Sequence, residues 1–373
     1  MPKTITVGVD IRDLHTAKTG TKTYLQELCK EFRKLEVPGV KFKFIDSTIP
    51  VYNGKNKILN LIGHFRYLVW KQLILPVKAL LGGCDVVFCT DTVVPLMKLG
   101  FKTIPVFHDA FFFETPENYG KVWLWLYLTT ALPAAMRSPF VVTPSAYAKK
   151  QINQHTNIPL NKLVVIAEGP KEINTITESS EILNQFNLMS GKYLLHVGSM
   201  FKRKNLPALI RAFSKIKADG KFDLKLVLAG SLSPASVESD HTEIVNAIDR
   251  YKLSDDVILT GYLPDRAVSQ LYQSALVYVF PSINEGFGIP VLEAFQYNLP
   301  VIAADNTSLP EVGGNAIITF DPFDTDDIYL KIKTVLNDPE LRSRLIAKGN
   351  ERLNLFSWKK AALELVELFR KAV

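Results

Sequence analysis

The sequence predicts an α/β protein built from two doubly wound parallel-sheet domains. Short apolar runs alternate with amphipathic helical segments, which is typical of parallel strands joined by helices. The pattern begins at residues 4–11 and restarts at residues 193–197, each time as a strand, a glycine-containing loop and a helix. The chain has 373 residues, 47% of them hydrophobic, which is enough for two domains with proper cores.

A change in composition predicts where one domain gives way to the other. Residues 171–190 are polar and aperiodic, so we interpret them as an interdomain linker. We therefore expect a first domain over residues 1–172 and a second domain over residues 190–356.

The expected elements of the first domain follow from its apolar runs. Strands are predicted at residues 4–11, 42–45, 86–89, 104–107, 140–143 and 163–166. Helices are predicted at residues 19–35, 55–81, 121–137 and 146–155, and Ser145 can cap the last of them. The run Phe111-Phe112-Phe113 is expected in a loop, as an apolar surface for an acceptor or buried against Trp123 and Trp125.

The second domain repeats this plan. Strands are predicted at residues 193–197, 223–229, 257–260, 276–280 and 301–304. Helices are predicted to begin near Leu206, at Pro290 and at Ser357, and the one at Pro290 should run to about Tyr297.

The whole chain has a net charge of +7, and the positive charge is concentrated in its first half. Residues 1–172 contain 22 Lys and Arg residues and 13 Asp and Glu residues. The rest of the chain contains 22 Lys and Arg residues and 24 Asp and Glu residues. The segment 55–81 combines many apolar residues with five cations, and such a helix can lie on anionic lipid or can pack on a sheet with a solvated basic edge. Those cations are Lys55, Lys57, Arg66, Lys71 and Lys78.

The composition also bears on location. Cys29, Cys84 and Cys89 lack metal-ligand or disulfide spacing, so each is expected to be a buried residue in a reducing compartment. The longest apolar run, residues 122–132, is too short to span a bilayer, and the N-terminus leads directly into a strand. We expect a cytoplasmic protein with a peripheral contact to the inner face of the plasma membrane. Basic charge is diffuse and no nucleic-acid motif occurs, so no nucleic-acid partner is expected.

The segment Glu285-Gly-Phe-Gly-Ile-Pro-Val-Leu-Glu293 carries the strongest chemical signal. Gly286 and Gly288 allow a tight backbone path after a buried strand, and Pro290 suits a helix start. The free amides of that helix start favour an anion, and the two carboxylates accept hydrogen bonds from hydroxyls. An anion together with hydroxyls describes a nucleotide sugar.

Two other strand ends carry candidate residues. Lys202, Arg203 and Lys204 lie in a loop that enters a helix N-terminus, which is electrostatically unfavourable unless an anion such as a diphosphate binds there. His108 follows the strand 104–107, at the edge of an open parallel sheet where ligands bind. A histidine in that position can equally be a hydrogen-bonded structural residue.

The Glu-x7-Glu motif after Pro281-Ser282 resembles the donor motif of retaining, nucleotide-sugar-dependent glycosyltransferases of the GT-B fold. The resemblance is to family 4, the large family of bacterial mannosyl- and glucosyltransferases, and it is strongest over residues 193–320. It implies two Rossmann-like domains that face a central cleft, with the C-terminal helix, residues 357–373, joining the first domain.

The resemblance also implies roles for individual residues. The catalytic group would be His108, Glu285, Arg203 and Lys204. The donor-binding residues would be Gly20, Gly198, Tyr262, Leu263, Gly286, Phe287, Gly288, Ile289 and Glu293, although Gly20 can also be explained by its turn alone. Two positions depart from the family pattern. Ser199 stands where many relatives have Arg, and Glu168-Gly169-Pro170 replaces Asn-Gly-Val, so a phosphate contact and any role of Glu168 are in doubt.

These residues predict a hexosyltransferase that moves a mannose- or glucose-type sugar to a glycan or lipid-linked acceptor in cell-surface polysaccharide synthesis. We expect no cofactor beyond the nucleotide-diphosphate sugar and no obligatory metal ion, because Asp324-Thr325-Asp326 is expected at a surface helix start. A nucleotide-sugar epimerase of the same fold and a non-catalytic membrane-surface protein are the alternatives.

Overall fold

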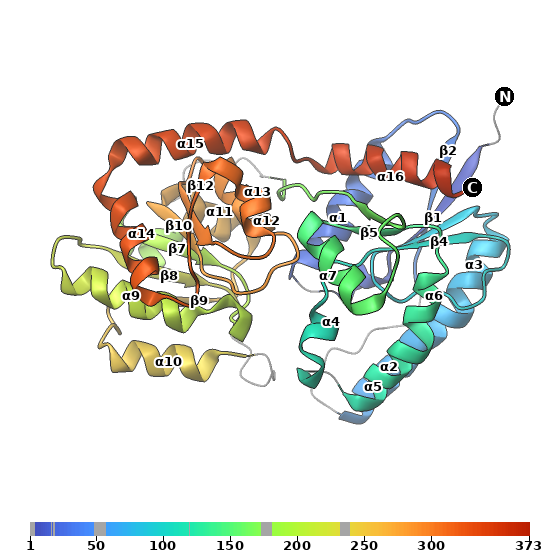
Figure 1. Cartoon of the computed structure of the whole chain (residues 1–373), viewed down its shortest axis with the longest axis horizontal. Helices are drawn as coiled ribbons and strands as arrows, with labels where there is room; N and C mark the ends of the chain where they lie inside the picture. Colours follow the sequence, from blue (N-terminus) through green and yellow to red (C-terminus); the bar gives the residue numbers. More distant parts are fainter. Residues whose placement is uncertain are drawn as a thin grey trace. The chain divides into compact units, whose positions relative to one another are not determined.

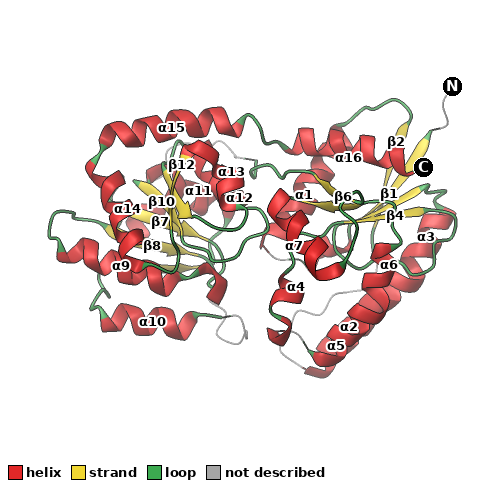
Figure 2. Cartoon of the chain, in the orientation of Figure 1, coloured by secondary structure: helices red, strands yellow, loops and turns green. Residues whose placement is uncertain are grey.

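The computed structural model describes residues 4–15, 17, 19–47, 57–118, 120–172, 181–231 and 239–373. The chain forms two compact units: unit 1 comprises Met1–Glu168 and Ser357–Val373, and unit 2 comprises Gly169–Phe356. In each unit parallel strands lie between helices (Figure 1, Figure 2). The predicted α/β class with two parallel-sheet domains is confirmed.

Unit 1 is built on a four-stranded parallel sheet with the order β2-β1-β3-β4. These strands are β1 (Ile5–Asp10), β2 (Val40–Ile45), β3 (Val86–Cys89) and β4 (Lys102–Pro105). A two-stranded parallel sheet of β5 (Val141–Thr143) and β6 (Leu163–Val165) continues from it through the bridge between Val106 and Val142. Asp10 at the end of β1 is paired with Cys89 at the end of β3, so the residues after these strands meet at one sheet edge.

The helices of unit 1 surround these strands. They are α1 (Thr19–Lys34), α2 (Lys57–Val69), α3 (Leu75–Leu81), α4 (Phe111–Glu114), α5 (Lys121–Leu126), α6 (Leu132–Met136), α7 (Ala146–Thr156) and α16 (Trp358–Ala372). Ser145 caps α7 by accepting from Ala148 N, as predicted, and Ser357 caps α16 in the same way. Phe369 of α16 packs on Phe88 of β3, which ties the C-terminal helix to the sheet of unit 1.

Unit 2 contains a six-stranded parallel sheet with the order β12-β11-β10-β7-β8-β9. The strands are β7 (Tyr193–Val197), β8 (Lys225–Ala229), β9 (Val257–Gly261), β10 (Val277–Phe280), β11 (Val301–Ala304) and β12 (Ile317–Phe320). The chain runs from β7 outward to β9 and then returns to β10 beside β7, so the topological switch point lies between β7 and β10. Ligands of doubly wound sheets bind beyond the carboxyl ends of the strands at this point.

The helices of unit 2 connect these strands. They are α8 (Glu181–Gln185), α9 (Leu206–Ala218), α10 (His241–Arg250), α11 (Asp265–Ser274), α12 (Ile289–Gln296), α13 (Leu309–Gly313), α14 (Thr325–Asn337) and α15 (Pro339–Leu353). A single 3-10 turn, Lys202–Lys204, precedes α9.

Several local expectations were wrong. The Phe run forms the short helix α4 rather than a loop, and Phe112 packs on Tyr127. Strand β12 was not predicted. The expected linker 171–190 includes α8, whose Ile182 is buried, and residues 173–180 lie outside the described residues.

The predicted helix 55–81 contains an irregularity that moves one of its cations. A π-helical turn, Trp70–Ile74, separates α2 from α3. It places Lys71 in the interior, where Nζ lies 2.7 Å from Asp10 Oδ2 and 2.8 Å from Asp91 Oδ1. Lys71 is fully buried, so it belongs neither to a lipid-facing surface nor to a solvated basic edge. Lys55 lies outside the described residues.

Candidate active site

Three loops at the carboxyl edge of the unit 2 sheet meet at the switch point. They follow β7, β10 and β11, which are neighbours in the sheet. The first carries Arg203 and Lys204, the second carries Glu285, and the third carries Asn306 and Ser308. Residues distant in the sequence are thereby brought to the edge where a ligand is expected.

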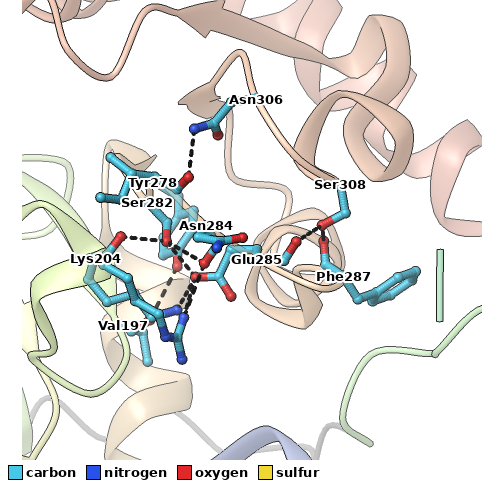
Figure 3. A network of polar contacts seen from close by, with 11 residues as sticks. Val197, Lys204, Tyr278, Ser282, Asn284, Glu285, Phe287, Asn306 and Ser308 are labelled. Carbon is cyan, nitrogen blue, oxygen red and sulfur yellow. Dashed lines mark hydrogen bonds and ion pairs between the residues drawn. The ribbon is translucent and has the colours of Figure 1, made fainter. Parts of the chain in front are cut away.

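The carboxylate of Glu285 is the centre of this site (Figure 3). Its Oε1 atom lies 2.9 Å from Nη1 of Arg203 and within hydrogen-bond distance of Nζ of Lys204. The hydroxyl of Ser282 is 2.6 Å from the same oxygen. All of these contacts converge on Oε1, so Oε2 is not used by them and can accept from a ligand.

The surroundings keep both members of the central ion pair charged near neutral pH. Burial alone would raise the pKa of the Glu285 carboxyl, but Lys204 and Arg203 outweigh it and lower the pKa to about 2. Burial lowers the pKa of Lys204 to about 8, and Arg203 adds to this effect while Glu285 opposes it. A group of two cations and one carboxylate carries a net positive charge, which suits an anionic ligand.

Hydrogen bonds to backbone atoms hold the Glu285 loop against its neighbours. Ile283 N donates to Arg203 O over 2.8 Å, which joins the loops after β7 and β10. Ser308 Oγ lies 2.9 Å from the carbonyl oxygen of Glu285 and 2.6 Å from that of Phe287. Asn306 Nδ2 donates to Ile283 O over 2.9 Å. The position of the carboxylate is therefore fixed from both sides.

Two glycines at the carboxyl edge of the unit 2 sheet are required by close packing. Gly288 has a φ of +122°, and a Cβ there would lie 2.9 Å from Leu309 Cδ2. A Cβ on Gly230, after β8, would lie 1.8 Å from the carbonyl oxygen of Gly198, after β7. The backbones at the ends of β7 and β8 therefore approach too closely for any side chain at Gly230.

The remaining predicted donor residues of unit 2 lie in different surroundings. Tyr262, after β9, is 80% exposed, whereas Leu263 is half-buried. The side chains of Phe287 and Ile289 are buried, so only their backbone groups are available to a ligand. Glu293 is outside the hydrogen-bonded group around Glu285, among the described contacts, and accepts from Tyr272 Oη over 3.1 Å. Burial raises the pKa of the Glu293 carboxyl.

The predicted residues of unit 1 are Gly20 and His108. Gly20 lies exposed in the first turn of α1, and no described atom lies within 4 Å of a Cβ built there. The packing around this turn therefore does not require a glycine at position 20. His108 is 20% exposed and contacts Glu168, whose importance the sequence did not indicate.

Ser282, Ser308 and Tyr272 were also missed. The sequence offered two signals for them, the Pro281-Ser282 strand end and the turn that begins at Ser308, which resembles a turn near the donor in the family. The pair Asp324 and Asp326 lies at the start of α14 as expected, where Asp324 caps the helix. The described residues contain no group of three or more His, Cys, Asp or Glu side chains able to hold a metal ion.

The site residues of unit 2 lie within the part of the chain that matches a known sequence family. Residues 179–352 match the family described as glycosyl transferases group 1. The O-antigen chain mannosyltransferase B of Escherichia coli is 29% identical over 273 residues, which cover 72% of this chain and 70% of that protein. The serotype-specific mannosyltransferase WbdA of Escherichia coli is 28% identical over 284 residues, and the match covers 34% of that protein.

Solved structures share the fold over nearly the whole chain. The sucrose-phosphate synthase of Thermosynechococcus elongatus matches with a TM-score of 0.75 at 17% identity, covering 98% of both chains. Anabaena Alr3699/HepE in complex with UDP-glucose matches with a TM-score of 0.71 at 15% identity, covering 98% of this chain and all of that chain.

The fold is that of the GT-B glycosyltransferases, and the family match together with the mannosyltransferase relatives makes the chain a glycosyltransferase. Within this class, residues 179–352 form a glycosyl transferases group 1 domain.

Proposed function

We propose that the enzyme transfers a mannose- or glucose-type hexose from a nucleotide-diphosphate sugar to a glycan or lipid-linked acceptor in cell-surface polysaccharide synthesis. The observation that carries this proposal is the convergence of Arg203, Lys204 and Glu285 at the switch point of unit 2. The O-antigen mannosyltransferase relatives support the hexose and the polysaccharide, and the HepE structure with UDP-glucose supports the class of donor.

The charges of the site suit the departure of a diphosphate. Arg203, which is about one-third exposed, and Lys204 would stabilise the negative charge that develops on the leaving group. The Oε2 atom of Glu285, which the contacts with Arg203, Lys204 and Ser282 do not use, would accept a sugar hydroxyl, and Glu293 would accept from the ribose. We propose that these cations and the amides at the start of α12 take the part of a metal ion. We also propose retention of configuration by a front-side route, in which the leaving diphosphate assists deprotonation of the acceptor.

Thermal shift with a panel of nucleotide sugars tests donor binding, because a ligand of the folded state raises apparent stability. The cognate donor should raise the melting temperature of the wild type and not that of the double variant Arg203→Ala, Lys204→Ala. Unchanged transfer rates in the double variant would contradict the assignment. Conversion of a donor without an acceptor would favour an epimerase, and the absence of binding by any donor would favour a non-catalytic protein.

The surface of unit 1 supports a second proposal, peripheral association with anionic membranes. Apolar residues recur every few positions along α2, the π-helical turn and α3, so they share one side of this segment. Phe65 is 66% exposed and Leu81 is 82% exposed, and the exposed Arg66 and Lys78 accompany them. The other exposed apolar members are Ile62, Leu73, Val77 and Leu80. No helix in the described part of the chain is long and apolar enough to cross a membrane.

Flotation with vesicles that contain anionic lipid tests this association. The double variant Phe65→Ser, Leu81→Ser should lose binding, because apolar insertion and charge act together. Phe323→Ser is the matched control, since Phe323 is 77% exposed but belongs to unit 2. A wild-type protein that stays wholly unbound at low salt would end this proposal.

A further inference from the structure

The imidazole of His108 lies between two hydrogen-bond acceptors in unit 1. Its Nε2 atom is 3.1 Å from the carbonyl oxygen of Thr90, after β3. Its Nδ1 atom is 3.4 Å from Oε1 of Glu168, after β6. Parallel pairing brings these residues together, because β3 pairs with β4 and Val106, after β4, pairs with Val142 of β5 beside β6.

This geometry determines how many protons the ring carries. A carbonyl oxygen only accepts, so the contact with Thr90 requires a proton on Nε2. A neutral ring would then direct the Nδ1 lone pair at the carboxylate of Glu168, which is repulsive. A second proton, on Nδ1, satisfies both contacts and makes the pair an imidazolium with a carboxylate. The side chain of Glu168 is only 6% exposed, so water screens this pair weakly.

The other groups around the ring do not compensate for Glu168. Tyr24 of α1 places its ring edge-to-face with His108, with centroids 4.8 Å apart. Burial, together with Glu168, raises the pKa of the Tyr24 hydroxyl, so it stays neutral. Asp109 accepts from Phe111 N and adds a second negative charge beside the ring. Burial lowers the pKa of His108, but Glu168 and Asp109 outweigh it and the net shift is upward.

We propose that Glu168 is a positioning residue that fixes His108 as an imidazolium. His108 then cannot serve as the base that removes the acceptor proton. It contributes a fixed positive charge instead, and its part in the transfer reaction rests on the proposed function. The Glu at position 168, where the resembling family has Asn, gives this chain the second carboxylate that keeps the ring protonated.

Imidazole resonances of the free protein, followed by ¹H–¹⁵N NMR over a pH titration, test the proposal without any substrate. The chain has six histidines, and a His108→Gln sample identifies the resonance of His108. In the wild type its midpoint should lie above the ordinary value of about 6.5, and in Glu168→Gln it should fall by about one pH unit. Glu114→Gln is the matched control, since Glu114 pairs with the more exposed His155 at 3.9 Å. That change should leave the His108 midpoint in place.

Transfer kinetics add a second readout. The value of kcat/KM should decline as pH rises through the His108 midpoint, and this decline should move to lower pH in Glu168→Gln but not in Glu114→Gln. A wild-type midpoint at or below 6.5, or a midpoint unchanged in Glu168→Gln, overturns the proposal. If Glu168→Gln does not fold, the wild-type midpoint of His108 is the test, and a value at or below about 6.5 refutes the imidazolium. Normal titration with no transfer from any donor would instead refute the proposed function.

Discussion

Replacing Glu285 by Gln should destabilise unit 2, because it leaves two cations without their shared counter-ion. Lys204 is 8% exposed at its side chain, so its ammonium has little water to replace the carboxylate. Breaking a buried pair by removing one partner costs about 3 kcal/mol or more. The Arg203 pair is 30% exposed on the arginine side and adds less than about 1 kcal/mol. We therefore expect a loss of about 3 kcal/mol in the free energy of unfolding.

Urea unfolding followed by far-UV circular dichroism measures this loss. Trp70, Trp123, Trp125 and Trp358 all belong to unit 1, so their fluorescence without denaturant shows that this unit is intact in the variant. Glu293→Gln is the matched control. It makes the same chemical change in the same unit, but Glu293 accepts from a tyrosine and has no direct ion pair among the described contacts. It should cost less than about 1 kcal/mol.

Binding of a phosphate ligand distinguishes the loss of the counter-ion of Arg203 and Lys204 from a general disruption of the Glu285 loop. Inorganic pyrophosphate should stabilise Glu285→Gln more than the wild type, because in the variant no carboxylate competes for Arg203 and Lys204. If Glu285→Gln unfolds within about 1 kcal/mol of the wild type, the carboxylate is not the buried counter-ion and the reasoning fails. Equal stabilisation of both proteins by pyrophosphate would show that the carboxylate does not compete with phosphate for these cations.

Three further changes test the site. The affinity of the wild type for pyrophosphate should fall as pH rises through about 8, where Lys204 loses its proton, and Lys204→Arg should remove this fall. Titration calorimetry between pH 6 and 9 measures both effects. A wild-type affinity that does not change with pH would contradict the role of Lys204. Gly20→Ala should raise the free energy of unfolding by about 0.5 kcal/mol, because alanine favours the first turn of α1 more than glycine does. If Gly20 is a donor-binding residue, the same change should lower kcat/KM by about tenfold. Unchanged kinetics would leave Gly20 without a role in donor binding. Gly288→Ala should cost about 2 kcal/mol, because its φ is +122° and Leu309 lies in the way; a neutral effect in urea unfolding would refute the strain.

The sequence predicted those features that depend on local signals. The cap at Ser145, the start of the last helix at Ser357, the burial of all three cysteines and the helix after Gly288 were confirmed, because each follows from neighbouring residues. The α/β class was confirmed for the same reason, since alternating strands and helices are a repeated local pattern.

The missed features depend on contacts between distant residues. Lys71 meets Asp10, 61 positions earlier, and a π-helical turn changes the helical periodicity at that point. Glu168 meets His108 only because β3, β4, β5 and β6 bring their ends together. The role of Ser308 in holding the Glu285 loop likewise requires β11 to lie beside β10. Such neighbours follow from strand order, which the local pattern does not specify.

The path of the chain has a consequence for its synthesis. Unit 2 is a continuous segment, Gly169–Phe356, inserted between two parts of unit 1. The ring of Phe369 packs on Phe88, so the interior of unit 1 stays incomplete until the last turns of α16 have been translated. Unit 2 can therefore fold on the ribosome first, whereas unit 1, whose synthesis began earlier, is completed only when α16 has been added.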